Sequence, residues 1–203
     1  FVLKAKEDIY SSIDGSLMFE KDSVITTENS GAIVNTGSEV GNGIYALSLD
    51  GHLDISNLPM STKGASYYLQ EVKTLDGCVL DTVQYDAVFK QSDFTTKNYI
   101  KSFDVENKTT DFEFNKTDVT GDKEVEGAQL TITDEDGNVV DQWTSDGKVH
   151  SIEGLVVGKT YTLSETVTAK DYVKATDIKF TVKNSSELET VTMKDKQVFV
   201  SKT

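Results

Sequence analysis

Residues 160–166 read TYTLSET, in which the apolar Tyr161 and Leu163 alternate with polar residues. This alternation is typical of a β-strand with one face in the protein interior, because successive side chains of a strand point to opposite faces. Runs of the same kind recur along the chain, separated by turn signals such as Asp146-Gly147. No stretch of ten or more residues keeps a helical period. The sequence therefore predicts an all-β fold whose strands have the spacing of a β-sandwich.

One turn is predicted at residues 134–138, which read DEDGN. The acidic run superficially resembles a calcium loop, but it lacks the distal glutamate at the spacing that such a loop needs. The Asp-Gly pair instead predicts a type I′ hairpin turn, in which both central residues have positive φ.

An internal repeat indicates the domain organisation. The TYTLSET stretch has an earlier counterpart at residues 66–72, which read SYYLQEV, so that Glu71 corresponds to Glu165. Each stretch is followed by an apolar strand, at residues 85–89 in the first case and 178–182 in the second. The chain is therefore predicted to carry two copies of one β-module.

A second internal match joins the start of the second module to the end of the chain. Residues 112–117 read FEFNKT and residues 198–203 read VFVSKT. We therefore predict one module at residues 1–109, which begins without its first strand, and a second module at residues 110–197. Residues 198–203 are then the first strand of a following repeat.

Composition excludes several classes of function. The chain has 203 residues and a formal net charge of −14, and its 20 basic side chains are all lysines. Without arginine, so acidic a chain is a poor candidate for binding nucleic acid. One cysteine and two histidines cannot form a disulfide or a cysteine–histidine zinc site, and neither a metal ion nor a cofactor is expected. The longest apolar run is only a few residues, so no membrane insertion is expected in this segment.

The second module resembles the CnaB or SpaA-type (collagen-adhesin B-domain) modules of Gram-positive surface adhesins and pilins. The resemblance covers residues 111–196 and rests on ordered motifs: FNKTD at 114–118, EGA at 126–128, WTSDG at 143–147, YTLSET at 161–166, Tyr172, and VTMKD at 191–195. It implies two tandem Ig-like or prealbumin-like β-sandwich domains. It also implies an extracellular location, on the cell surface or in the cell wall of a Gram-positive bacterium.

The resemblance further implies a spontaneous intramolecular isopeptide bond. Carried over by motif, Lys116 is the nucleophile, Asp195 the electrophile and Glu165 the catalytic proton relay. The chemistry requires burial, because a lysine at its ordinary pKa of about 10.4 is protonated and cannot attack. Burial favours the neutral amine of a lysine, and it also favours the neutral, protonated form of a carboxylic acid. The reaction turns over once and releases water, so the protein is not expected to be an enzyme. The alternative is an ordinary salt-bridge cluster on the surface of a sheet.

The first module matches the pattern less completely. Glu71 occupies the catalytic position, and Asn107 fits the acceptor on the last strand, where an asparagine would release ammonia instead of water. The reactive lysine should stand about a dozen residues before the strand that starts at Phe1. Lys4 and Lys6 lie on the wrong strand for this role.

Two explanations for the missing lysine stay open. The first is a processing or sequence boundary that separates the module from its opening strand. The second is strand donation, in which residues 198–203 of another copy fill the vacant edge of the module. Lys202 could then couple to Asn107 between chains, which would give head-to-tail self-association.

The leading prediction is a structural stalk fragment of an adhesin or pilin, whose partners are neighbouring repeats of the same protein. The cross-link would limit the unfolded ensemble much as a disulfide does. The alternative is a ligand-binding adhesin head or a carbohydrate-binding module, with a host-matrix or glycan ligand. Its support is the long insertion at residues 14–54 of the first module, with Tyr45, His52, Tyr67 and Tyr68 nearby.

Overall fold

The computed structural model of the chain describes residues 1–90 and 100–198, and almost all of its regular structure in this part is β-strand. The predicted all-β class is therefore confirmed. Helical structure in the described part is the single turn α1 (Thr27–Ser30). No helix in these residues is long and apolar enough to cross a membrane.

Contacts between residues divide the chain into two units, which are described separately. Unit 1 comprises Phe1–Thr74 and Leu80–Glu106, and unit 2 comprises Leu75–Val79 together with the chain from Asn107 onward. The module boundaries predicted after residues 109 and 197 stay a prediction, and the contacts add that a short loop from the first half of the chain belongs with unit 2.

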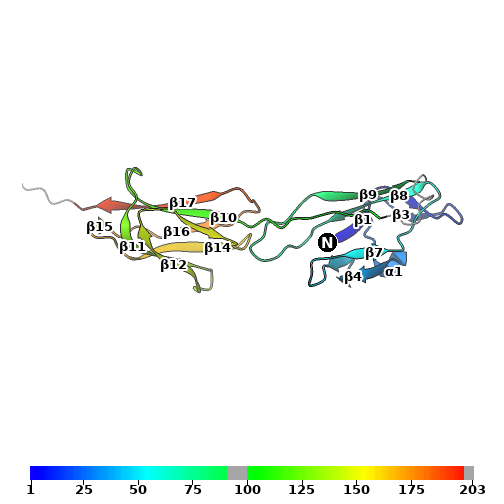
Figure 1. The fold of residues 1–203 in the computed structure, drawn as a ribbon, viewed down its shortest axis with the longest axis horizontal. Helices are drawn as coiled ribbons and strands as arrows, with labels where there is room; N and C mark the ends of the chain where they lie inside the picture. Colours follow the sequence, from blue (N-terminus) through cyan, green and yellow to red (C-terminus); the bar gives the residue numbers. More distant parts are fainter. Residues whose placement is uncertain (91–99, 199–203) are drawn as a thin grey trace, which may run out of the picture. The chain divides into compact units, whose positions relative to one another are not determined.

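Unit 1 is built on one five-stranded antiparallel sheet with the strand order β5-β6-β1-β8-β9. Two smaller pairs, β2–β3 and β4–β7, accompany it, and Figure 1 labels both strands of the second pair. The strands of the unit are β1 (Val2–Ala5), β2 (Ile9–Tyr10), β3 (Leu17–Phe19), β4 (Ile33–Thr36), β5 (Ser38–Gly41), β6 (Ile44–Ala46), β7 (Asp54–Ser56), β8 (Gly64–Gln70) and β9 (Gln84–Lys90). The core of the unit combines side chains of these strands, such as Ile9, Tyr45 and Tyr67, with Ile25 from a connecting segment.

The tyrosines that supported the ligand-binding alternative belong to the interior of unit 1. Tyr45 and Tyr67 are fully buried and Tyr68 is only 4% exposed, whereas His52 is exposed. The Tyr45 hydroxyl donates to the Ile25 carbonyl at 2.8 Å, and burial raises the pKa of Tyr45 to about 12. These three tyrosines therefore do not support a ligand-binding surface, because their aromatic rings are buried in unit 1.

Unit 2 has two four-stranded sheets, with strand orders β13-β10-β17-β15 and β12-β11-β14-β16. Its strands are β10 (Asp111–Asp118), β11 (Glu126–Thr133), β12 (Val139–Asp146), β13 (His150–Glu153), β14 (Thr160–Val167), β15 (Tyr172–Val173), β16 (Ile178–Thr181) and β17 (Glu189–Gln197). All pairs are antiparallel except β10 with β17, which run parallel (Figure 1). The core residues come from both sheets: Phe112, Phe114, Leu130, Ile132, Leu155, Tyr161, Leu163, Val182 and Met193.

The loop at Leu75–Val79 is hydrogen-bonded into unit 2. The Thr110 N–H donates to the Gly77 carbonyl at 3.1 Å, and the Val79 N–H donates to the Lys108 carbonyl at 2.8 Å. Gly77 has a φ of 83°, and a Cβ at this position would lie 2.5 Å from the Gly154 carbonyl oxygen. Only glycine therefore fits the close approach of the two chain segments.

The turn at residues 134–138 is not of type I′, so that prediction is wrong. Gly137 has a φ of 83°, but Glu135 and Asp136 do not have positive φ. The Asp134 carboxylate accepts hydrogen bonds from the N–H groups of Asp136 at 3.0 Å and Asn138 at 2.8 Å. These bonds hold a three-residue loop that ends in a left-handed glycine, which is a common alternative to the two-residue turn.

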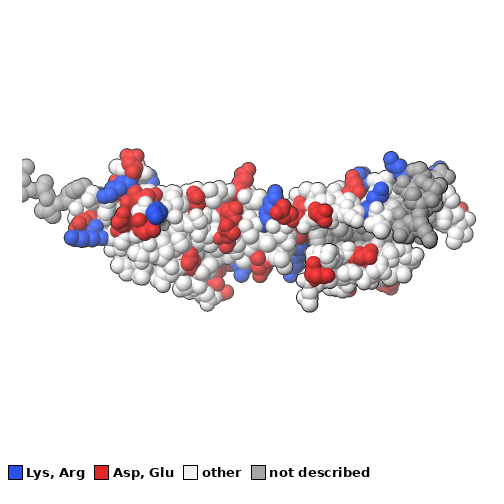
Figure 2. Space-filling model, in the orientation of Figure 1, with Lys and Arg blue, Asp and Glu red and all other residues white. Residues whose placement is uncertain are grey.

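The surface carries the acidic character that the composition predicts. Acidic side chains are spread over the visible face of both units, with lysines among them (Figure 2). Glu165 and Asp195 do not contribute to this acidic surface, because both are fully buried.

Candidate functional site

Strand β10 directs Lys116 into the core of unit 2. Phe112, Phe114 and Lys116 occupy alternate positions on the strand, and each is only 2% exposed. The lysine therefore follows the same inward phase as the two phenylalanines, since side chains of a strand alternate between its faces. Burial of a lysine is uncommon and requires a partner.

Strand β17 supplies Asp195 to the same face of the same sheet. Its parallel register with β10 pairs Lys116 with Met193 and Asp118 with Asp195. Asp195 is therefore two residues beyond the direct partner of Lys116, on the same face, and it is fully buried. The Lys116 Nζ forms a hydrogen-bonded ion pair with Asp195 Oδ1.

The opposite sheet supplies Glu165, from strand β14. Tyr161, Leu163 and Glu165 alternate inward on this strand, and Glu165 is fully buried. Its Oε1 lies 3.2 Å from the Lys116 Nζ. The structure thus brings together Lys116, Glu165 and Asp195, which the sequence placed in one site, and it places them in the core instead of on the surface of a sheet.

Burial sets the electrostatics of this cluster. The pKa of Asp195 is raised, first because burial disfavours the charged carboxylate, an effect that the Lys116 charge opposes and the Glu165 carboxyl reinforces. Among the described residues, Asp195 Oδ2 accepts no hydrogen bond, and Glu165 Oε1 has only its ion-pair contact with the Lys116 Nζ. A proton on one of the two carboxyls would satisfy both oxygens, because the protonated group can donate to the other.

The backbone holds Glu165 through its other oxygen. The Ala175 N–H, ten residues further along the chain, donates to Glu165 Oε2 at 2.8 Å. This bond fixes the direction of the carboxyl group and leaves Oε1 facing the lysine. Sequence reasoning did not identify Ala175, because a main-chain donor leaves no signal in the residue type.

Glu71 in unit 1 is held in the same way as Glu165. It is only 6% exposed, and the Asp81 N–H, again ten residues further along, donates to Glu71 Oε2 at 2.7 Å.

The other residues predicted for unit 1 have different surroundings. Lys4 is half-buried on β1, and Lys6 forms an exposed ion pair with Asp86. Asn107 is exposed and belongs to unit 2. Lys202 and most of the predicted strand at residues 198–203 lie outside the described residues.

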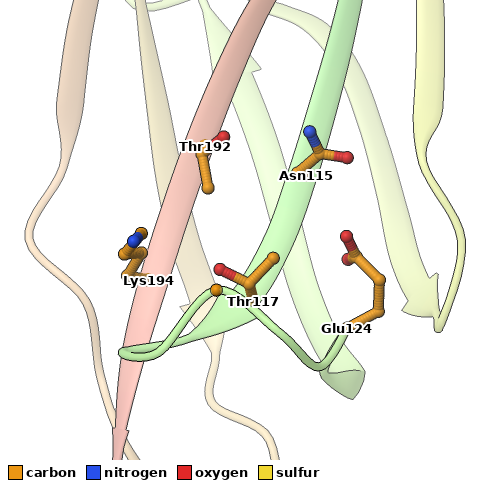
Figure 3. A pocket seen from close by; sticks show the side chains of 6 residues that line it. Asn115, Thr117, Glu124, Thr192 and Lys194 are labelled. Atoms are coloured by element: carbon orange, nitrogen blue, oxygen red, sulfur yellow. The ribbon is translucent and has the colours of Figure 1, made fainter.

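Sequence reasoning also missed Glu124. This half-buried side chain accepts a hydrogen bond from the Lys116 N–H at 3.2 Å. It lines a hollow of about 300 Å³ on the face of the β10–β17 pair opposite to the core (Figure 3). A glutamate eight positions after a lysine carries no recognisable pattern, so only the folded chain identifies this contact.

Comparisons with known proteins agree with the predicted resemblance. Residues 110–197 match the family model described as "SpaA: Prealbumin-like fold domain", which confirms that the second module is of the SpaA type. No curated protein sequence matches the chain.

Several solved structures are similar to the chain at low sequence identity. The Bacillus anthracis TIE protein is 24% identical, with a TM-score of 0.46 over 81% of this chain and 30% of that chain, so the present chain spans less than a third of its length. A C-terminal fragment of the pilus adhesin SpaC from Lactobacillus rhamnosus GG is 13% identical, with a TM-score of 0.46 over 99% of this chain and 90% of that chain. The C-terminal domain of the shaft pilin SpaA from the same organism is 21% identical, with a TM-score of 0.29 over 44% of this chain and 98% of that chain.

Proposed function

We propose that unit 2 closes itself with an isopeptide bond between Lys116 and Asp195. The observation that carries this proposal is the contact of Lys116 Nζ with a carboxyl oxygen of Asp195 inside the core, where the three side chains are no more than 2% exposed. A permanently charged lysine and two carboxylates would be expensive to keep in such an interior. An amide bond removes the charges of the lysine and the aspartate together.

The reaction begins from the neutral members of the cluster. The Lys116 amine attacks Asp195 Cγ, while the protonated Glu165 donates to the carboxyl oxygen that accumulates negative charge. The attack forms the C–N bond, Glu165 carries one amine proton to the departing oxygen, and the bond between Cγ and that oxygen breaks. The oxygen that stays returns its proton to Glu165, which ends the reaction as it began. One water leaves for each bond formed, and the proximity of amine and carboxyl replaces an encounter in solution.

The bond would give the unit a mechanical role. Lys116 and Asp195 are 79 positions apart, on the first and last strands of unit 2, which are neighbours in one sheet. A tension applied to the two ends of the unit would pass from β10 through the bond to β17, so the intervening residues would carry none of it. We therefore propose that the chain is a stalk segment of an adhesin or pilin, arranged with neighbouring repeats on the outside of a Gram-positive cell.

Intact mass of the full chain tests the bond. We expect the wild-type protein to weigh one water less than its sequence, and we expect Lys116→Ala to match its sequence mass. Lys194→Ala is the matched control, because Lys194 is exposed on the same pair of strands and should leave the deficit unchanged. A wild-type mass equal to that of the sequence would overturn the proposal.

The equivalent position in unit 1 supports a second, related proposal. Glu71 would serve an isopeptide bond of unit 1 whose lysine is supplied by a strand outside residues 1–109. Its support is the hydrogen bond from the Asp81 N–H, which reproduces the support of Glu165. The strand could be the segment before Phe1 in a longer polypeptide or, by strand donation, residues 198–203 of another copy.

Electrophoresis under denaturing and reducing conditions distinguishes the two sources. If a strand is donated between copies and Lys202 forms the bond, the gel should show a ladder of covalent oligomers. Lys202→Ala should abolish the ladder, and the Lys194→Ala control should retain it. A single monomer band from concentrated protein would contradict covalent donation between copies.

A further inference from the structure

The backbone of Lys116 is held from the side away from β17. On that side β10 pairs with β13 only as far as Phe114, which stands opposite His150. Beyond this point β10 pairs with residues 123–125, the segment in which the chain runs back along β10 (the returning chain). Thr117 and Glu124 form a β-bridge there. The reactive lysine therefore lies just past the end of one strand pairing, where the sheet needs another partner.

Glu124 and Val125 provide that partner. The Val125 N–H donates to the Lys116 carbonyl at 2.7 Å. The Lys116 N–H has no strand to donate to on this side, and it donates instead to Glu124 Oε2 at 3.2 Å. Both backbone groups of Lys116 are thus bonded to the returning chain, and one of the two bonds is made by a side chain.

The hollow beside β10 explains how an acidic side chain can make this bond without entering the core. Six residues line it: Asn115, Thr117, Gly121, Glu124, Thr192 and Lys194. Figure 3 shows the Glu124 side chain extending from the returning chain along β10, on the side of Asn115. The hollow is open and polar, so a carboxylate can accept from a main-chain N–H there, and bonds of this kind are stronger than those between neutral groups.

We propose that Glu124 is a positioning residue for the bond between Lys116 and Asp195, which rests on the self-linking function proposed above. Glu124 touches neither reacting group, and it acts on the strand that carries the amine. Lys116 must reach a carboxyl two residues beyond its direct strand partner, so its Cα position determines whether Nζ meets Asp195. A displacement of about 1 Å at a reacting group can slow a reaction by about a hundredfold.

The rate of bond formation tests this role, because a merely structural role would change stability and leave the rate in the folded state unaltered. The full chain is isolated under denaturing conditions, before it has folded, and then diluted into native buffer. Trp143 fluorescence follows the folding of unit 2, since this tryptophan packs against its core. Intact mass of quenched samples follows the loss of water.

Four variants separate the hydrogen bond from the charge. We expect Glu124→Ala to fold but to lose water about tenfold to a hundredfold more slowly than the wild type. Glu124→Asp keeps the charge but is too short to reach the Lys116 N–H, so it should also be slow. Glu124→Gln keeps the acceptor at full length and should restore most of the rate. Asp122→Ala removes a neighbouring exposed acid and should react like the wild type.

The outcomes for the two proposals are distinct. A wild-type chain that folds without losing water overturns the self-linking function and the positioning role with it. If the wild type loses water, and Glu124→Ala and Glu124→Asp lose it at the wild-type rate, only the positioning role is overturned. Should Glu124→Ala fail to fold, the comparison of Glu124→Asp with Glu124→Gln decides, because equal rates in these two would contradict the need for a reaching acceptor.

Discussion

Glu165→Gln is the substitution that isolates the contribution of the bond to stability. Glutamine has the same shape as glutamate, and its oxygen can still accept from the Ala175 N–H, which lies 2.8 Å from Oε2 in the native protein. Its amide group can donate to Asp195 Oδ2, an oxygen that has no donor among the described residues. The ion pair of Lys116 with Asp195 stays in place, but the proton relay is removed, so the bond should not form.

The expected loss follows from the length of chain that the bond closes. Lys116 and Asp195 are 79 positions apart. The chain-entropy relation for a cross-link over such a loop gives about 4.5 kcal/mol in the free energy of unfolding. For a domain of this size, that loss corresponds to a decrease in Tm of roughly 20–35 °C.

Urea and thermal unfolding followed by Trp143 fluorescence measure this loss. Trp143 is the single tryptophan of the chain and packs against the core of unit 2, so its signal reports that unit. Glu71→Gln is the matched control, since it makes the same change at the equivalent position of unit 1 and should not alter the transition of unit 2. The reasoning is refuted if Glu165→Gln loses one water like the wild type. It is also refuted if the variant keeps its full mass and unfolds at the wild-type urea concentration.

Two further predictions concern the frame around the site. Gly77→Ala should destabilise unit 2 by roughly 1–3 kcal/mol, because its φ is left-handed and its new Cβ would lie 2.5 Å from the Gly154 carbonyl oxygen; an unchanged urea midpoint of Trp143 fluorescence would argue against this close approach. Asp134→Ala should destabilise unit 2 at neutral pH, because the Asp134 carboxylate accepts hydrogen bonds from the main-chain N–H and the side-chain amide of Asn138. These bonds hold the pKa of Asp134 below its ordinary value of 3.8. A lowered carboxyl pKa stabilises the folded state above the ordinary value and loses that effect as the pH falls through the lowered value. The stability difference between wild type and variant should therefore shrink in acid, and a difference independent of pH would contradict it.

The three site residues could be predicted because the family resemblance named Lys116, Glu165 and Asp195. The structure adds that Lys116 stands in phase with Phe112 and Phe114, and that Glu165 stands in phase with Tyr161 and Leu163. In each case a charged residue continues a run of side chains that faces the interior. The structure places all three in one cluster, while the bond itself stays a prediction.

The features that escaped prediction depend on main-chain groups and on pairing between distant segments. The N–H groups of Ala175 and Asp81 hold Glu165 and Glu71, and a main-chain donor is the same in every residue type except proline. The burial of Tyr45 could not be predicted either. An aromatic side chain in a long insertion can pack into a core as readily as it can face a ligand.

The sequence by itself determined the all-β class and the repeat, and its resemblance to a known family named the three reactive side chains. The all-β class follows from local alternation, which a strand obeys wherever it lies in a sheet. Only the tertiary structure decided that β10 runs parallel to β17 with Lys116 opposite Met193, which brings Asp195 within reach across 79 positions of chain. It also decided that Glu124 takes the N–H that β13 leaves unpaired. Strand register depends on which segments of the chain pair with each other, and so does the partner of an unpaired main-chain N–H. Local sequence does not determine this pairing, because it forms only when the two sheets pack on their common core.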